Sequence, residues 1–360
     1  MKSPDTVFEM YSVPIFDTGH PEYLRGDEIA SNKVVVKKND VLLCKINPRI
    51  NRVWVVADES EHINIASSEW IVVRNKSYNP HFLAWYFRSP RFKQLMVSEV
   101  TGIGGSLTRA QPKAVAEYPV PVLARAEQDK ITIVLNKIAS LIEARKQELR
   151  RLDELIKARF VEMFGEDRNP SVKLMDLIID GAGLSYGIVQ PGDDGTGDMG
   201  VLRPVDMVDG KISLNSIKYI DRSIGDGYKR TELTGEELLI TVRGTTGITA
   251  LTDVRFRGMN VTRGIAVIRF DSSKINPVYL NTYLNASESQ RYIQEHTRGA
   301  TLQQINLSDL RELEITIPPM DLQEQFALFA IQVDKSKAVI QKSLEEAQLL
   351  FDSLMQQYFG

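Results

Sequence analysis

Two long stretches without glycine or proline constrain the fold of this chain more than any other feature. The first runs from Ala126 to Phe164 and the second from Leu322 to Phe359. Both consist mostly of good helix formers, and their apolar residues recur at steps of three and four. Such a stripe leaves one face of each helix apolar, so each helix needs a partner that covers it. Because the two stretches are similar in length, we expect them to pack against each other as an antiparallel coiled coil.

The two helical stretches follow two copies of one sequence order. An apolar segment with a proline precedes each helix, a Glu-Gln pair lies near its start, and Phe-Gly ends it. Matching residues upstream share an offset of about 197 positions. The matched pairs include Asp40 with Glu237, Pro80 with Pro277, and Gln128 with Gln325. The order is therefore lobe, helix, lobe, helix, which indicates an internal duplication with approximate twofold symmetry.

This order predicts an α+β chain with two mixed α/β lobes and two spacer helices. The expected boundaries are 1–122 for the first lobe, 123–168 for the central helix, 169–320 for the second lobe and 321–360 for the last helix. In the first lobe we expect strands at Lys33–Val36 and Asp40–Lys45 joined by a turn at Lys38-Asn39, and a last short strand ending at Val120-Pro121. The second lobe contains a segment, Val172–Gln190, that the first lobe does not match. The first lobe is therefore expected to be shortened at its N-terminus.

Composition excludes several classes of function. The single cysteine, Cys44, excludes an internal disulfide framework and fits a reducing compartment. Four histidines leave little for a transition-metal site, and we expect no metal and no cofactor. The sequence contains no phosphate-binding loop, dinucleotide fingerprint, nucleophile elbow, His-Glu-x-x-His motif or Asn-Pro-Pro-aromatic tetrad, so we expect no catalytic residues. Without a long apolar run or a signal peptide, the chain is expected to be cytoplasmic.

Polar loops at matching places in the two lobes are the candidate binding site. Arginine can pair two acceptors of guanine, asparagine or glutamine can pair adenine, and hydroxyl groups can bond phosphates. The candidates in the first lobe are Lys45, Asn47, Arg49, Arg52, Ser106, Thr108 and Arg109. The candidates in the second lobe are Ser185, Tyr186, Gln190, Arg243, Thr245, Thr246, Arg298, Thr301, Gln303 and Gln304. The three tryptophans lie in strand or helix patterns and are expected in the core rather than on a base-stacking surface.

The duplicated lobes, the two Glu-Gln helices and the borders Tyr118–Pro121 and Ile315–Pro319 resemble the specificity subunits of type I restriction-modification systems. The segments Gly104–Ser106 and Ser185–Ile188 fit the same family. The resemblance implies that each lobe recognises one half of a bipartite sequence in double-stranded DNA, with the paired helices as the spacer. It also implies a chain without catalysis that recruits two methylation subunits and, in the full complex, two restriction subunits. These partners would bring the S-adenosylmethionine and ATP chemistry.

A second function class stays open at this stage. The lobes could bind proteins instead of DNA, which would make the chain a two-lobed scaffold without DNA recognition. The two hypotheses differ in the salt dependence of DNA binding, because phosphate contacts weaken steeply as salt rises. An unrecognised nuclease is a third, disfavoured reading, which cleavage of DNA by the chain alone with Mg²⁺ would reveal.

Overall fold

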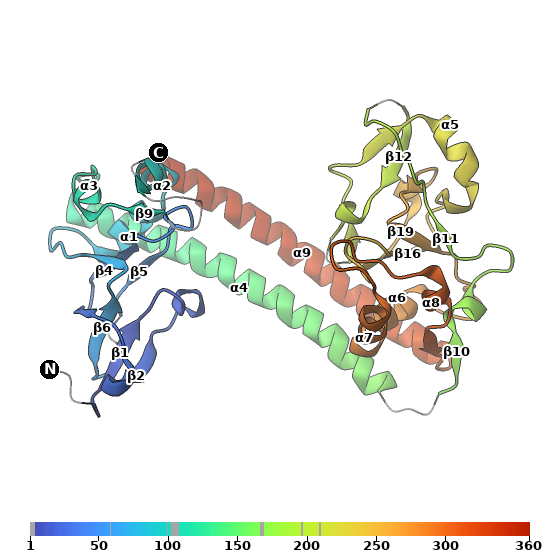
Figure 1. Cartoon of the computed structure of the whole chain (residues 1–360), viewed down its shortest axis with the longest axis horizontal. Coiled ribbons are helices and arrows are strands. Elements are labelled where there is room, and N and C mark those ends of the chain that lie inside the picture. The colour runs from blue at the N-terminus through green and yellow to red at the C-terminus, as the bar shows by residue number, and fades with distance from the viewer. Residues whose placement is uncertain are drawn as a thin grey trace. The chain divides into compact units, whose positions relative to one another are not determined.

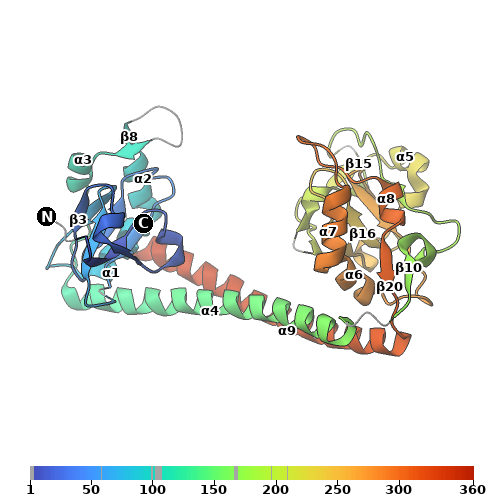
Figure 2. The ribbon, with the colours of Figure 1, turned by 60° about the horizontal axis from the view of Figure 1, so that its bottom comes forward.

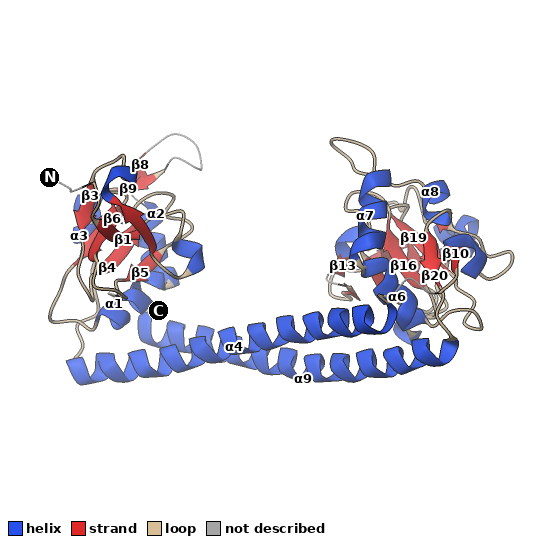
Figure 3. Cartoon of the chain, turned by 90° about the horizontal axis from the view of Figure 1, so that it is seen from below, coloured by secondary structure: helices blue, strands red, loops and turns tan. Residues whose placement is uncertain are grey.

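The computed structural model describes residues 4–57, 59–98, 100–101, 108–165, 169–195, 197–208 and 210–360. The chain divides into two compact units. Unit 1 comprises Met1–Gln147 with Ile340–Gly360, and unit 2 comprises Glu148–Val339. Both units mix helices and strands, so the predicted α+β class is confirmed (Figure 3). None of the helices within these ranges combines the length and apolar character that a membrane span requires.

The two predicted long helices are α4 (Arg125–Phe164) and α9 (Met320–Phe359), and each contributes to both units (Figure 1). In unit 1, Leu135 of α4 lies in one buried cluster with Met355 and Phe359 of α9. In unit 2, the ring of Phe160 of α4 lies 5.4 Å from the ring of Phe326 of α9. The beginning of each helix therefore packs beside the end of the other, and the predicted antiparallel pairing is confirmed.

The described part of unit 1 holds three sheets and three short α-helices. One sheet has the strand order β2-β1-β6-β3, the second has the order β5-β4-β7, and the third pairs β8 with β9. The strands are β1 (Val7–Tyr11), β2 (Glu22–Arg25), β3 (Lys33–Val35), β4 (Val41–Cys44), β5 (Val53–Val55), β6 (Ile63–Ser67), β7 (Trp70–Val73), β8 (Val100–Thr101) and β9 (Arg109–Ala110). The helices are α1 (Pro80–Arg88), α2 (Pro90–Ser98) and α3 (Pro112–Ala116).

The central strand β4 is buried on both faces, because successive side chains of a strand point to opposite sides. Val41 and Leu43 pack with the short helices and the two long helices, in the cluster that also holds Leu135. Leu42 and Cys44 pack on the other face with Trp54 and Trp70. The burial predicted for the tryptophans is confirmed, with Trp54 and Trp70 in the core and Trp85 partly buried against it. Burial raises the pKa of the Cys44 thiol, which behaves as a small apolar side chain.

Unit 2 repeats this plan and adds further strands. Its main sheet has the order β11-β19-β16-β17, and α6 and α7 lie side by side against it (Figure 2). The strands are β10 (Ser171–Lys173), β11 (Ser185–Tyr186), β12 (Met199–Leu202), β13 (Met207–Val208), β14 (Lys211–Ile212), β15 (Lys218–Ile220), β16 (Leu238–Thr241), β17 (Thr249–Leu251), β18 (Asn260–Val261), β19 (Ile265–Ile268) and β20 (Glu314–Thr316). The helices are α5 (Arg222–Gly225), α6 (Pro277–Asn285), α7 (Ser287–His296) and α8 (Leu307–Arg311).

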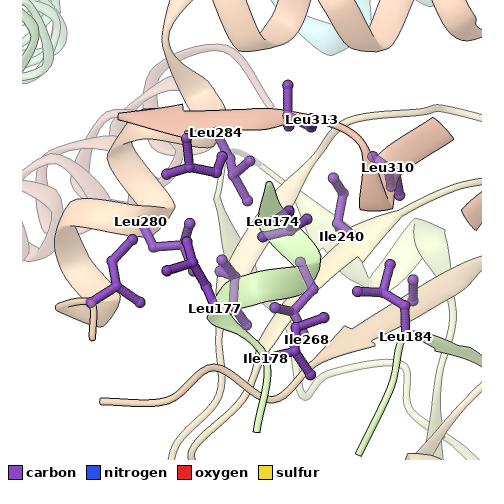
Figure 4. Packing of buried hydrophobic residues seen from close by; sticks show 14 of the residues in the cluster. Leu174, Leu177, Ile178, Leu184, Ile240, Ile268, Leu280, Leu284, Leu310 and Leu313 are labelled. Atoms are coloured by element: carbon purple, nitrogen blue, oxygen red, sulfur yellow. The ribbon is translucent and has the colours of Figure 1, made fainter. Parts of the chain in front are cut away.

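The core of unit 2 lies on one face of β16 and β19. Ile240 and Ile268 of these strands pack against Leu280 and Leu284 of α6 and against Leu310 of α8 (Figure 4). The alternate residues Leu239 and Val267 enter a second cluster on the opposite face. β16 is thus the counterpart of β4, buried on both sides.

The duplication is visible in a buried glutamine at the start of each long helix. Gln128 Oε1 accepts from the Asn79 N–H at 2.8 Å, and Asn79 caps α1. Gln323 Oε1 accepts from the Asn276 N–H at 2.9 Å, and Asn276 caps α6. The predicted pairing of Gln128 with Gln325 is therefore wrong by two residues. Gln325 is exposed, whereas Gln128 and Gln323 are buried.

Two strand predictions in unit 1 are also wrong. β3 does not form a hairpin with β4; it pairs antiparallel with β6, so the turn at Lys38-Asn39 carries the chain from one sheet to the other. No strand includes Val120 or Pro121. The matching border in unit 2 forms β20 because β10 pairs with it. β10 belongs to the segment that the first lobe does not match, and no described strand of unit 1 takes its place.

Candidate nucleic-acid interface

In unit 1 the candidate site begins where β4 ends. The chain turns through Asn47 and Asn51, whose φ angles of 47° and 53° lie in the left-handed region that asparagine tolerates better than most residues. The Asn51 side chain donates to the carbonyl oxygen of Phe87 at 3.0 Å, which fixes the turn to the end of α1. The turn leaves Arg49 exposed at its tip. Arg49 makes no ion pair with any residue in the described part of the chain.

The second candidate segment of unit 1 lies directly beside this turn. Ile46 forms a β-bridge with Arg109. The Asn47 N–H donates to the carbonyl oxygen of Thr108 at 2.9 Å, and the Ala110 N–H donates to that of Lys45 at 2.9 Å. The structure thus brings together the two segments that the sequence predicted as binding loops. Ser106, the remaining candidate here, lies outside the described residues.

Unit 2 joins the corresponding segments by the same backbone pattern. Arg243 forms a β-bridge with Gln304. The Gly244 N–H donates to the carbonyl oxygen of Gln303 at 2.9 Å, and the Ile305 N–H donates to that of Val242 at 3.0 Å. Arg243 therefore takes the place of Ile46, and Gln304 the place of Arg109. We call the joined pair of segments the loop pair of each unit: 45–52 with 108–110 in unit 1, and 242–247 with 298–305 in unit 2.

The second segment of the unit 2 loop pair is a closed hairpin. Arg298 and Gln304 exchange two backbone hydrogen bonds of 2.8 Å each. Gly299 turns the chain with a φ of 102°, a value that side chains other than glycine rarely adopt. Thr301 and Gln303 are exposed at the tip, as is most of the Arg298 side chain.

A third segment of unit 2 lies on the same sheet. In β11, Ser185 and Tyr186 pair with Val267 and Ala266 of β19, and β19 in turn pairs with β16, which leads to Arg243. Beyond it, Gly187 passes so close to β18 that an added Cβ would lie 1.9 Å from the Val261 carbonyl oxygen. Tyr186 and Gln190 are exposed. The candidates of unit 2 therefore lie on connected strands and loops.

Some predicted side chains point inward. Thr246 is buried, and its hydroxyl lies 3.0 Å from the hydroxyl of Thr297. Thr108 is buried, and its hydroxyl has no hydrogen-bond partner among the described residues. Arg52 is half-buried with its Nε enclosed. Thr245 beside Thr246 is exposed. The inward side chains shape the loops, and the exposed ones form the accessible surface.

The cations of the two loop pairs differ in their partners. In unit 1, Arg109 lies 3.1 Å and Lys45 lies 3.9 Å from the carboxylate of Glu69. In unit 2, Arg298 lies 3.6 Å from Asp309, and Arg243 has no ion pair within the described residues. Glu69 was absent from the sequence-based candidates because the strand β6 before it was not predicted. Its only sequence signal is a carboxylate in the tight turn between two apolar runs.

The described residues hold no group of three or more His, Cys, Asp or Glu side chains that could bind a metal ion. The loop pairs instead present guanidinium, ammonium, amide and hydroxyl groups. These groups can donate hydrogen bonds to phosphates and to base edges in the grooves of a duplex.

Comparisons with known proteins relate this chain to one family of DNA specificity subunits. Residues 197–349 match the family described as "Type I restriction modification DNA specificity domain". The chain is 22% identical over 315 residues to the type I restriction enzyme EcoBI specificity subunit of Escherichia coli. That alignment covers 79% of this chain and 65% of the relative, so it spans slightly less than two thirds of the relative's length.

At least two solved structures share the fold. The S subunit of a type I restriction-modification system from M. genitalium gives a TM-score of 0.58 at 12% identity, covering 100% of this chain and 90% of that one. A chain from a structure on complex assembly and conformational transition of the type I R-M system gives 0.55 at 19% identity, covering 99% and 92%. The resemblance to type I specificity subunits predicted from the sequence is confirmed by these matches.

Proposed function

We propose that this chain is the DNA-specificity subunit of a type I restriction-modification complex and that each unit recognises one half of a bipartite duplex sequence. The supporting observation is the loop pair. The same backbone hydrogen bonds join the same two segments in both units, and the exposed side chains there are suited to DNA. A repeated backbone arrangement that carries different side chains at its tips is suited to recognising two different half-sites.

In this proposal the exposed loop residues contact DNA together with the half-buried Lys45, Asn47, Arg243 and Gln304. In unit 2, Arg243 and Arg298 are suited to guanine or phosphate, and Gln303 and Gln304 to adenine. The complete proposed set is Lys45, Asn47, Arg49 and Arg109 in unit 1, and Tyr186, Gln190, Arg243, Thr245, Arg298, Thr301, Gln303 and Gln304 in unit 2. Arg52, Thr108, Thr246 and Ser185 would support these loops from within, and Ser106 stays a sequence-based candidate.

The chain would have no catalysis and no cofactor of its own. It would recruit two methylation subunits, and two restriction subunits in the full complex, all acting on DNA in the cytoplasm. Several apolar side chains of the long helices are exposed and so available to such partners. Leu328 and Val339 of α9 are 71% and 72% exposed in unit 2, and Leu349 is 73% exposed in unit 1.

Substitution of Arg243 by alanine tests the assignment of unit 2. If Arg243 pairs with a base, binding should weaken by about 1–3 kcal/mol, and only the half-site recognised by unit 2 should become degenerate. Long-read mapping of methylated bases, in cells that express the chain with its methylation partner, measures both half-sites at once. Arg255→Ala is the matched control, because it removes the same charge from an exposed arginine outside the loop pair.

Three results would contradict parts of this proposal. An equal fall in affinity for every sequence would make Arg243 a phosphate contact rather than a base contact. An unchanged recognition sequence would remove Arg243 from the interface. Failure of the complex with wild-type chain to bind duplex DNA in a salt-dependent manner would favour the protein-binding scaffold.

A further inference from the structure

A single carboxylate lies beside two of the proposed cations of the unit 1 loop pair, Lys45 and Arg109. Glu69 lies in the turn between β6 and β7, and its backbone oxygen accepts from the Lys45 N–H at 3.0 Å. Its side chain lies 3.1 Å from an Arg109 guanidinium nitrogen through Oε1 and 3.9 Å from Lys45 Nζ through Oε2. Only about a quarter of the Glu69 and Lys45 side chains is exposed, whereas 55% of the Arg109 side chain is.

Unit 2 has the same backbone arrangement without the carboxylate. The Val242 N–H donates to the carbonyl oxygen of Gly264 at 2.8 Å, as the Lys45 N–H donates to that of Glu69. Gly264 is therefore the counterpart of Glu69. A Cβ at Gly264 would lie 2.6 Å from a ring carbon of Pro204, so unit 2 has no room for a side chain at this place. A carboxylate at this place is therefore a property of unit 1, whereas in unit 2 the carboxylate of Asp309 lies 3.6 Å from Arg298.

Two cations and one carboxylate leave this cluster with a single net positive charge. A phosphate that approached Arg109 would compete with a carboxylate that already accepts a hydrogen bond from it. A phosphate that approached Lys45 would meet the same carboxylate 3.9 Å away, while Lys45 Nζ donates to the carbonyl oxygen of Ser68 at 2.8 Å. Binding would then release fewer counterions from the DNA than two free cations would, because the protein neutralises fewer phosphates.

We propose that Glu69 is a built-in counter-ion that bonds Arg109, partly neutralises the neighbouring Lys45 and so limits the sequence-independent attraction of unit 1 to DNA. This inference rests on the proposed function, because it takes Lys45 and Arg109 as DNA contacts. Glu69 is a positioning residue that acts through the two cations. Unit 1 consequently depends more on contacts to the bases, while Arg243 in unit 2 meets DNA without a competing carboxylate.

The test is the salt dependence of binding of the full chain, with its methylation partner, to a labelled duplex of arbitrary sequence. Glu69→Gln removes the charge and preserves the shape of the side chain. If one more phosphate is neutralised, the slope of log K against log salt should steepen by about 0.9. The ratio of variant to wild-type affinity should then be about eightfold higher at 0.1 M salt than at 1 M salt. Glu69→Ala should give the same slope, which guards against a folding defect peculiar to one substitution. Thermal melts verify that both variants are folded.

Glu61→Gln is the matched control. Glu61 precedes β6 and is exposed, whereas Glu69 follows the same strand. The five-residue strand separates them by about 13 Å or more, beyond the screening length of about 10 Å at 0.1 M salt. Its slope should equal that of the wild type.

Two results would overturn the inference. One is an unchanged slope in both folded Glu69 variants while the wild-type complex binds DNA. The other is an equal change in Glu61→Gln, which would make the effect one of net charge. Absence of DNA binding by the wild-type complex would instead refute the proposed function itself.

Discussion

The buried glutamine at the start of α9 is expected to be a large local contributor to the stability of unit 2. Gln323 Oε1 accepts from the Asn276 N–H at 2.9 Å, and Gln323 Nε2 donates to the carbonyl oxygen of Pro318 at 2.8 Å. The side chain is fully buried. It therefore joins the long helix, the cap of α6 and the border segment before α9. Gln323→Leu preserves most of the side-chain volume and removes both hydrogen bonds.

The magnitude follows from the groups that lose their partners. A partly buried N–H and a buried carbonyl oxygen would each be left unsatisfied, at about 1–3 kcal/mol per group. Burial of the apolar leucine offsets about 1–2 kcal/mol of this loss. At the middle of these ranges, the net loss in the free energy of unfolding is about 2–3 kcal/mol. At roughly 2–4 °C per kcal/mol for a domain of this size class, Tm should fall by roughly 4–12 °C.

Hydrogen exchange and calorimetry together provide the assay. Exchange of the Asn276 amide should accelerate in the variant, because the oxygen that protects this N–H is gone. Calorimetry of the full chain gives the change in Tm. The three tryptophans, Trp54, Trp70 and Trp85, all lie in unit 1, so their fluorescence follows the unfolding of unit 1 separately.

Two further variants make the comparison decisive. Gln325→Leu changes an exposed glutamine two residues away and should alter stability by less than about 0.5 kcal/mol. Gln128→Leu removes the equivalent bonds of 2.8 and 2.9 Å in unit 1 and should shift the tryptophan transition. If Gln325→Leu destabilised the chain and Gln323→Leu did not, the structural register of the repeat would be refuted.

Two further substitutions test the stability of unit 2. Burial alone would raise the pKa of Glu237, but hydrogen bonds from the surrounding N–H and hydroxyl groups outweigh it and lower the pKa. The carboxylate therefore stabilises the fold above its unfolded pKa of about 4.3, and this stability is lost as the pH falls through the lower pKa of the folded state. Urea unfolding should show that Glu237→Gln lowers the free energy of unfolding at pH 7 and that this difference from the wild type shrinks below about pH 4. Gly187→Ala should lower the free energy of unfolding by at least about 1–3 kcal/mol, because its Cβ would meet the Val261 backbone at 1.9 Å. Gly227→Ala, with open space around the added Cβ, is the control, and an equal loss there would refute the argument from close approach.

The sequence predicted those elements whose pattern is long or strongly apolar. Both long helices follow from long stretches of helical period without glycine or proline, and β4 follows from a short apolar run that is buried on both faces. Of the sheet β2-β1-β6-β3, the sequence predicted only β3, and with the wrong partner. The edge strand β2 was missed because it is short and half exposed. Exposed edge strands show little of the alternation from which strands are recognised.

The candidate site was predictable in place but not in detail. Arginine, asparagine and threonine after a strand indicated the loops, and the structure joins those loops in both units. Which side chains face outward depends on contacts with distant residues, such as the bond of Thr246 to Thr297. The two-residue shift between Gln325 and Gln323 had the same origin. The Glu-Gln pattern is local, whereas the buried glutamine is defined by its bond to an asparagine far away in the sequence.

The way in which the loop pairs are joined explains how one frame can present two different chemistries. All the bonds between the joined segments that recur in the two units run from backbone to backbone. Side chains at these positions therefore contribute little to holding the segments together. The side chains at these positions differ between the two units: Ile46 corresponds to Arg243, and Arg109 corresponds to Gln304. The buried strands below must keep their apolar residues, whereas the exposed tips can change their hydrogen-bonding groups with small effects on stability. Recognition of a new half-site would thus require new side chains on the loops and no change in the fold that supports them.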